Sequence, residues 1–99
     1  MTKIKKLVCL IDEELESAKC YAEKYLEYKV ENNSTWATRF KEMAGDELNH
    51  ANHLHELAVD EIQKLKAVYT PPASMEELWE NSHKNYVEKA AWIKQMLTM

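Results

Sequence analysis

Glycine and proline are almost missing from this sequence of 99 residues, which contains one glycine and two prolines. Alanine, leucine, glutamate and lysine dominate instead, and these residues favour helix. Because such a composition disfavours sheet and disorder, we predict an all-α protein. Its length is that of a single domain, residues 1–99.

The sequence lacks three further features, and each absence restricts the partners or the compartment of the protein. The net charge is −4 and the only basic cluster is Lys3, Lys5 and Lys6, so no nucleic-acid partner is predicted. No apolar run approaches the ~20 residues that span a membrane, and charges appear too early for a signal peptide. The two cysteines, Cys9 and Cys20, would lie ~16 Å apart on one helix, too far for a disulfide. Free thiols fit a reducing compartment, and we expect a cytoplasmic protein without membrane contact.

Apolar residues recur at steps of three and four along three stretches, which is the pattern of amphipathic helices. The predicted helices span about residues 3–30, 35–68 and 75–97. Ser74 and Glu77 have the spacing of a capping box at the start of the third helix. Because a chain this short buries a limited core, we predict an antiparallel hairpin plus a third helix. A second copy would complete a four-helix-type, ferritin-like bundle.

A few polar residues stand where apolar ones belong. Glu47 lies at the centre of the apolar arc of the second helix, where a carboxylate is costly unless paired, protonated or metal-bound. His50 follows three residues later in the same arc, so both side chains can reach one ion. Glu14 lies at the edge of the arc of the first helix. We therefore predict a metal site of Glu14, Glu47 and His50, with His83 of the third helix as an additional ligand or supporting group.

A structural role for the same residues is the alternative. Buried glutamate and histidine can form a hydrogen-bonded network that fixes helix register, and a Glu-x-x-His match arises readily by chance in a glutamate-rich chain. For three other histidines, each taken singly, a role without metal is the favoured interpretation. These are His83, the outward-pointing His53, and His55 at the margin of the apolar arc. The argument for metal is stoichiometric. Di-iron bundles need a Glu from each of two helices and a Glu-x-x-His from each of two others, which two copies would supply.

Two segments resemble a known family. Glu14–Tyr21 (ELESAKCY) is similar to the first-helix motif of ferritin-like proteins, especially the rubrerythrin type, and Met43–Ala51 (MAGDELNHA) resembles their second-helix Glu-x-x-His motif. The resemblance covers the first two helices and implies that Glu14, Glu47 and His50 ligate iron. The family has four core helices in one chain, whereas three are predicted here, and the third lacks a core-facing Glu-x-x-His. The whole chain also resembles small phage and prophage proteins of Gram-positive bacteria, from which no function carries over.

Two functions follow as hypotheses. The first is a di-metal carboxylate protein that binds iron, or alternatively manganese or zinc, and oxidises Fe(II) with oxygen or peroxide. Glu47 would bridge the metals, Glu14 would be a terminal ligand and His50 would complete the coordination. The second is a non-enzymatic, phage-type interaction protein that modulates a host factor. It would bind no metal tightly and would use an exposed surface around Trp92. A structural zinc site is disfavoured because neither cysteine faces the histidines.

Overall fold

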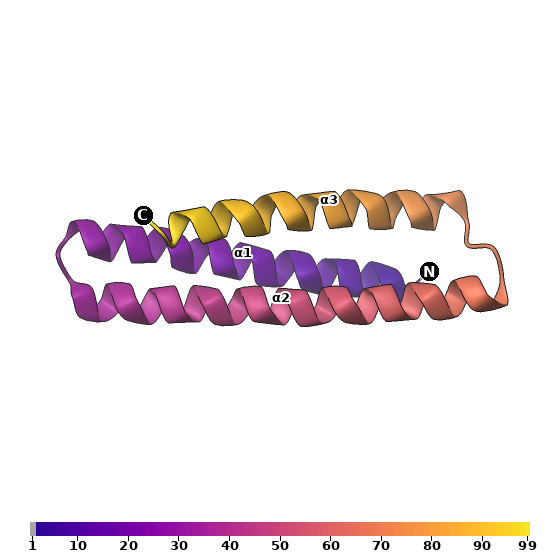
Figure 1. The fold of residues 1–99 in the computed structure, drawn as a ribbon, viewed down its shortest axis with the longest axis horizontal. Helices are drawn as coiled ribbons and strands as arrows, with labels where there is room; N and C mark the ends of the chain where they lie inside the picture. Colours follow the sequence, from indigo (N-terminus) through magenta and orange to yellow (C-terminus); the bar gives the residue numbers. More distant parts are fainter. Residues whose placement is uncertain (1) are drawn as a thin grey trace.

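The computed structural model describes residues 2–99, which form three helices and contain no strand (Figure 1). Helix α1 spans Thr2–Val30, α2 spans Ser34–Val68 and α3 spans Ala73–Met96. The helices alternate in direction along a body of 55 × 17 × 17 Å. The all-α class and the three helices are thus confirmed, and each predicted helix end lies within two residues of the observed one.

Asparagines shape the turn between α1 and α2. Asn32 has a φ of 60°, a left-handed conformation that asparagine tolerates better than most residues. Asn33 occupies the N-cap position of α2, where its Oδ1 accepts a hydrogen bond from the backbone N–H of Trp36 at 3.3 Å. This cap satisfies one of the free N–H groups at the start of the helix.

The capping box predicted for the third helix does not form. Helix α3 begins at Ala73, and the N-cap position belongs to Pro72, without a side-chain cap hydrogen bond. Ser74 therefore already lies within the first helical turn. The fixed φ of proline suits a helix start, and this explains why the helix begins earlier than the serine predicted.

Small residues bring α1 and α2 together. Helix α2 buries an alanine every seven residues: Ala37, Ala44, Ala51 and Ala58. This repeat keeps one face of α2 against its neighbour, and the small side chains let the two backbones approach closely. Helix α1 supplies larger core residues, of which Ile4, Ile11 and Leu15 are fully buried. Burial of each such side chain is worth roughly 1.5–3 kcal/mol.

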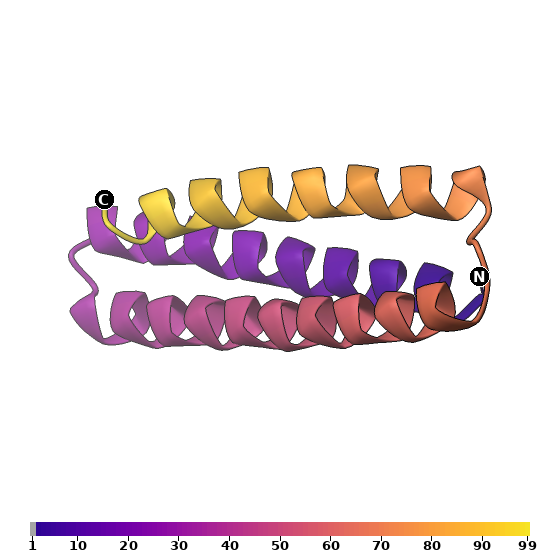
Figure 2. The ribbon, with the colours of Figure 1, turned by 45° about the vertical axis from the view of Figure 1, so that its right-hand side comes forward.

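Helix α1 lies between the other two helices (Figure 2). Most contacts of α3 are with α1, and α2 meets α3 mainly through longer side chains. Lys89 of α3 pairs with Glu16 of α1 at 2.6 Å, and the Asn85 side chain donates to Asp12 at 3.4 Å. Helix α3 therefore covers the side of α1 that carries Asp12 and Glu16.

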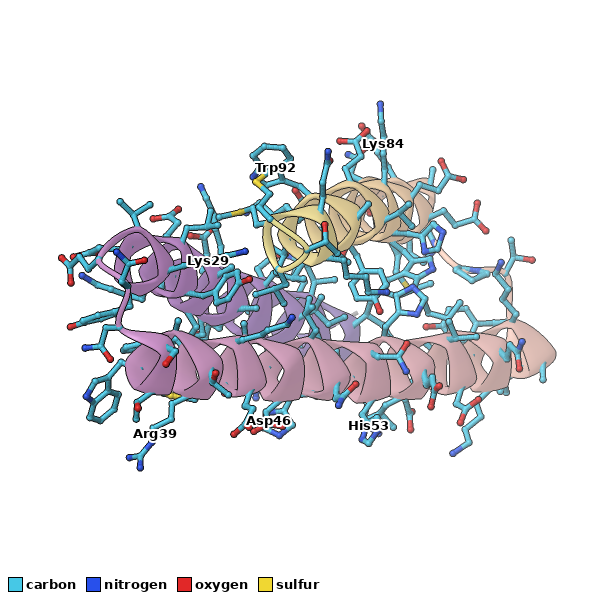
Figure 3. All side chains as sticks on the ribbon, turned by 60° about the vertical axis from the view of Figure 1, so that its left-hand side comes forward. Lys29, Arg39, Asp46, His53, Lys84 and Trp92 are labelled. Atoms are coloured by element: carbon cyan, nitrogen blue, oxygen red, sulfur yellow. The ribbon has the colours of Figure 1, made fainter. Side chains whose placement is uncertain are left out.

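The outer faces of α2 and α3 carry exposed side chains, most of them polar. Arg39, Asp46 and His53 point from α2 away from the bundle, as do Lys84 and Trp92 from α3 (Figure 3). The outward direction predicted for His53 is confirmed. Within the described residues, none of the helices combines the length and the apolar character needed to cross a membrane.

Candidate metal centre

Glu14 of α1 converges with Glu47 and His50 of α2 midway along the helical hairpin. Each side chain offers one ligand atom, and the three atoms lie within 4.8 Å of one another. His50 Nδ1 is 3.5 Å from Glu14 Oε2 and 3.8 Å from Glu47 Oε1. The register between α1 and α2 therefore brings Glu14 of one helix close to Glu47 and His50 of the other, which are the three residues singled out in the sequence.

The local structure places both carboxylates at the edge of the core. Glu47 stands between Ala44 and Ala51, which are fully buried, and Glu14 stands next to the fully buried Leu15. The side chains of Glu14 and Glu47 are only 27% and 22% exposed, whereas that of His50 is 57% exposed. The cluster is thus closed toward the core and open to solvent on the histidine side.

The two carboxyl groups are electrostatically incompatible when both are ionised. The pKa of Glu47 is raised, first by the Glu14 carboxyl, which favours a shared proton, then by burial and by the negative charge of Glu14. His50 acts in the opposite direction but does not cancel the rise. A proton or a metal cation would relieve this repulsion.

One oxygen of the cluster lacks a partner. Glu14 Oε2 is shielded from solvent and has no hydrogen-bond partner among the described residues. A buried carboxylate oxygen without a partner is costly, since it loses its water without gaining a donor. The lone pairs of this oxygen, together with Glu47 and the ring of His50, fit the carboxylate and imidazole ligand set of a transition metal.

The structure does not bring His83 to this cluster. His83 Nδ1 lies 2.8 Å from His55 Nε2, between α3 and α2. Glu14 is two positions from both Asp12 and Glu16 on α1, and residues two positions apart on a helix point in nearly opposite directions. Because α3 docks on the side of α1 that carries Asp12 and Glu16, Glu14 faces away from α3.

Sequence reasoning did not select His55 as a functional candidate. The sequence contains one indication of this position, which is the spacing of the residues that His55 contacts. Trp79, His83 and Tyr86 are four and three residues apart, so they share one face of α3. His55 stacks on Tyr86, with ring centroids 4.7 Å apart, and its centroid is 5.0 Å from that of Trp79. The position of His55 opposite this face depends on helix packing, which the sequence does not display.

An exposed apolar row runs through the Glu14–Glu47–His50 cluster. Trp36, Met43, His50 and Leu57 follow one another at seven-residue steps on α2, and Leu10 precedes Glu14 by one turn on α1. The four apolar members of this row are between 38% and 46% exposed. The cluster therefore lies within a partly apolar face of the α1–α2 hairpin that α3 leaves uncovered.

No family model matches the chain, and no curated protein or solved structure matches it either. Fold and site together define an antiparallel three-helix bundle with a Glu-Glu-His cluster on the open face of its hairpin.

Proposed function

We propose that this chain is a metal-binding helical protein whose ligands are Glu14, Glu47 and His50. The observation that carries the proposal is the convergence of three ligand atoms within 4.8 Å. Glu14 Oε2, a buried oxygen of the same cluster, has no hydrogen-bond partner among the described residues, and the nearby His50 Nδ1 lies 3.5 Å away. Two like charges placed together at the edge of a core cost stability in the metal-free chain. A bound cation removes that cost, which supports metal as the purpose of the arrangement.

Iron is the metal that we propose, because carboxylates with imidazole are the ligands of di-iron bundles and because the sequence resembles ferritin-like proteins. Manganese and zinc accept the same ligands and are the alternatives. Bound iron would supply oxidation of Fe(II) by oxygen or peroxide. The chain itself contributes two neighbouring carboxylates, an imidazole beside them and a wall of alanine and leucine that excludes water from the inner side.

A second copy of the chain is part of this proposal. One chain supplies one Glu and one Glu-x-x-His, which is half of the ligand set of a di-iron bundle. The open hairpin face carries both these ligands and the exposed apolar row of Leu10, Trp36, Met43 and Leu57. Two such faces packed together would bury the row and join both half-sites within four helices, with one α3 on each outer side.

The first test is anaerobic loading with Fe(II), followed by desalting and measurement of metal content and of mass in solution. We expect about one iron per chain in a dimer. Glu47→Ala should lose the iron, because it removes the proposed bridging carboxylate. Glu42→Ala, an exposed glutamate of the same helix, is the matched control and should retain it. An unsubstituted protein that retains no metal would contradict the proposal.

The alternative function is an interaction protein without metal, in which the three side chains form a structural network. The observation in its favour is Trp92, which is 51% exposed and points away from the bundle (Figure 3). In that case the unsubstituted protein would retain no iron. Trp92→Ala would then weaken capture of a host protein while leaving the melting temperature unchanged.

A further inference from the structure

A second group of potential metal ligands, a pair of histidines, lies between α2 and α3 and is separate from the Glu14–Glu47–His50 cluster. His55 Nε2 and His83 Nδ1 face each other at 2.8 Å, within hydrogen-bond distance. His55 belongs to α2 and is half-buried, whereas His83 belongs to α3 and is exposed. One nitrogen must carry a hydrogen and the other must offer a lone pair, so the two rings are joined by one shared hydrogen.

Aromatic packing restricts where the His55 ring can go. Tyr86 stacks against it at 4.7 Å with an interplanar angle of 18°, and Trp79 lies 5.0 Å away at 36°. The Tyr86 hydroxyl donates to Asn52 Oδ1 at 3.2 Å, one turn before His55 on α2. These contacts hold the imidazole toward His83, and such preorganisation is what a chelating pair requires.

We propose that His55 and His83 form a second metal site, which takes a late transition-metal ion such as Zn²⁺ and does not depend on the Glu14–Glu47–His50 cluster. Imidazole is a preferred ligand of Zn²⁺, Cu²⁺ and Ni²⁺. Zinc–nitrogen bonds of 2.0–2.1 Å at a tetrahedral angle separate two nitrogens by about 3.3 Å. The two nitrogens are 2.8 Å apart and the ring centroids 5.0 Å, so the nitrogens point almost directly at each other. Binding an ion therefore requires the exposed His83 ring to move outward and to turn until both lone pairs converge on the ion.

The bonding change is simple. In the metal-free pair, the hydrogen lies between the two facing nitrogens. When the ion binds, both of these nitrogens donate their lone pairs to it, and the hydrogen moves to the outward nitrogen of the same ring. With both rings neutral, no proton is lost. Water completes the coordination on the side where His83 is exposed.

The electrostatic surroundings favour this exchange. Burial, followed by the charge of His83, lowers the pKa of His55, which favours the neutral ring that a metal ligand requires. The carboxylate of Glu56 is close enough to raise the pKa of both His55 and Tyr86. Its negative charge would partly offset that of a bound cation.

Metal at this position would join the two helices that otherwise have the least direct contact. Helices α2 and α3 meet through long side chains, among them the His55–His83 pair and the Tyr86–Asn52 hydrogen bond. An ion bound to both histidines binds the folded chain better than the unfolded one, where the imidazoles are far apart. It should therefore raise the melting temperature in proportion to the logarithm of its concentration.

The test uses Zn²⁺ and a Glu14→Gln, Glu47→Gln background, in which the acidic cluster is removed. We expect calorimetric titration to show about one zinc per chain, with a zinc-dependent rise in melting temperature. Adding His55→Asn or His83→Asn should weaken binding by about tenfold or more and abolish that rise. His53→Asn is the matched control, because this histidine points away from the bundle, and it should change neither quantity (Figure 3).

A second measurement covers the case in which a substitution disturbs folding. In the unsubstituted protein, imidazole nitrogen resonances report each histidine separately. Zinc should shift His55 and His83 and leave His53 in place. The proposal is overturned if zinc leaves His55 and His83 unshifted, or if His83→Asn binds zinc as tightly as His53→Asn. Neither result would bear on iron at Glu47, which the Glu47→Ala comparison tests separately.

Discussion

The inward-facing glutamates of α2 differ in what neutralises them. The Glu61 carboxylate lies 3.2 Å from the Lys3 amine and 3.7 Å from that of Lys64, and its pKa is lowered, first by the hydrogen bond from Lys3. Glu47 has no lysine beside it and meets Glu14 instead, which raises its pKa. One glutamate is thus satisfied by the chain itself. The other needs a proton or a cation, and this contrast is why we propose it, rather than Glu61, as a metal ligand.

Glu47→Gln should stabilise the metal-free protein near neutral pH. Because the pKa of Glu47 is raised on folding, the folded chain favours the protonated form and loses stability as pH rises through that pKa. Glutamine mimics the protonated form at every pH. We expect the free energy of unfolding in chelator to rise by on the order of 1 kcal/mol at about pH 7. The gain should vanish at about pH 4, as denaturant titrations at both pH values would show.

Glu61→Gln is the matched control, and it should not stabilise the protein. It removes a carboxylate that is paired with Lys3 and Lys64, so stability at about pH 7 should fall slightly or stay level. If both substitutions changed stability in the same direction, the repulsion between Glu14 and Glu47 would not be the cause.

At the scale of helices, α3 is attached to the bundle through α1. Its buried Ile93 and Met96 belong to one cluster with Ala18 and Ala22 of α1 and with Ala37 and Ala44 of α2, but the backbone of α3 lies closest to α1. The Lys89–Glu16 ion pair lies at the margin of this contact. Which side of α1 receives α3 decides which face of the hairpin remains open, so this attachment leaves Glu14 uncovered.

The Lys89–Glu16 pair should make part of the stability depend on pH. The pKa of Glu16 is lowered on folding, first by its hydrogen bond with Lys89 and then by the lysine charge. Its contribution is therefore present above the ordinary glutamate pKa of 4.5 and is lost as pH falls through the lowered value. Lys89→Met should flatten the fall in melting temperature on acidification, and salt should weaken the effect in the unsubstituted protein. An unchanged acid profile in Lys89→Met would show that the pair contributes nothing.

The whole molecule is a rod of three helices with one face of its hairpin uncovered. Leu10, Met43 and Leu57 on this face have more exposed side chains than the apolar residues that are buried between the helices. The same face carries Glu14, Glu47 and His50. A second copy is the proposed cover, since it would bury the apolar row and double the ligand set at once.

Leu57→Lys should therefore separate the proposed dimer. The new charge would be buried between two copies, at two turns from His50, so it disrupts the interface without replacing a ligand. We expect a monomer by light scattering and a lower iron content per chain. Val87→Lys is the matched control: Val87 is also exposed, but it belongs to α3. A dimer that persists in Leu57→Lys, or is lost equally in Val87→Lys, would place the interface elsewhere.

The sequence by itself determined the features that arise within one helix. The three helices follow from apolar spacing, and Glu47 shares a face with His50 because residues three apart always do. Other features depend on how separate helices meet. The approach of Glu14 to Glu47 requires the register of α1 against α2, and the pairing of His83 with His55 requires the side of α1 on which α3 docks. Register and docking side come from the packing of many side chains on several helices, including the alanine face of α2. No local pattern contains that information, and only the tertiary structure decided it.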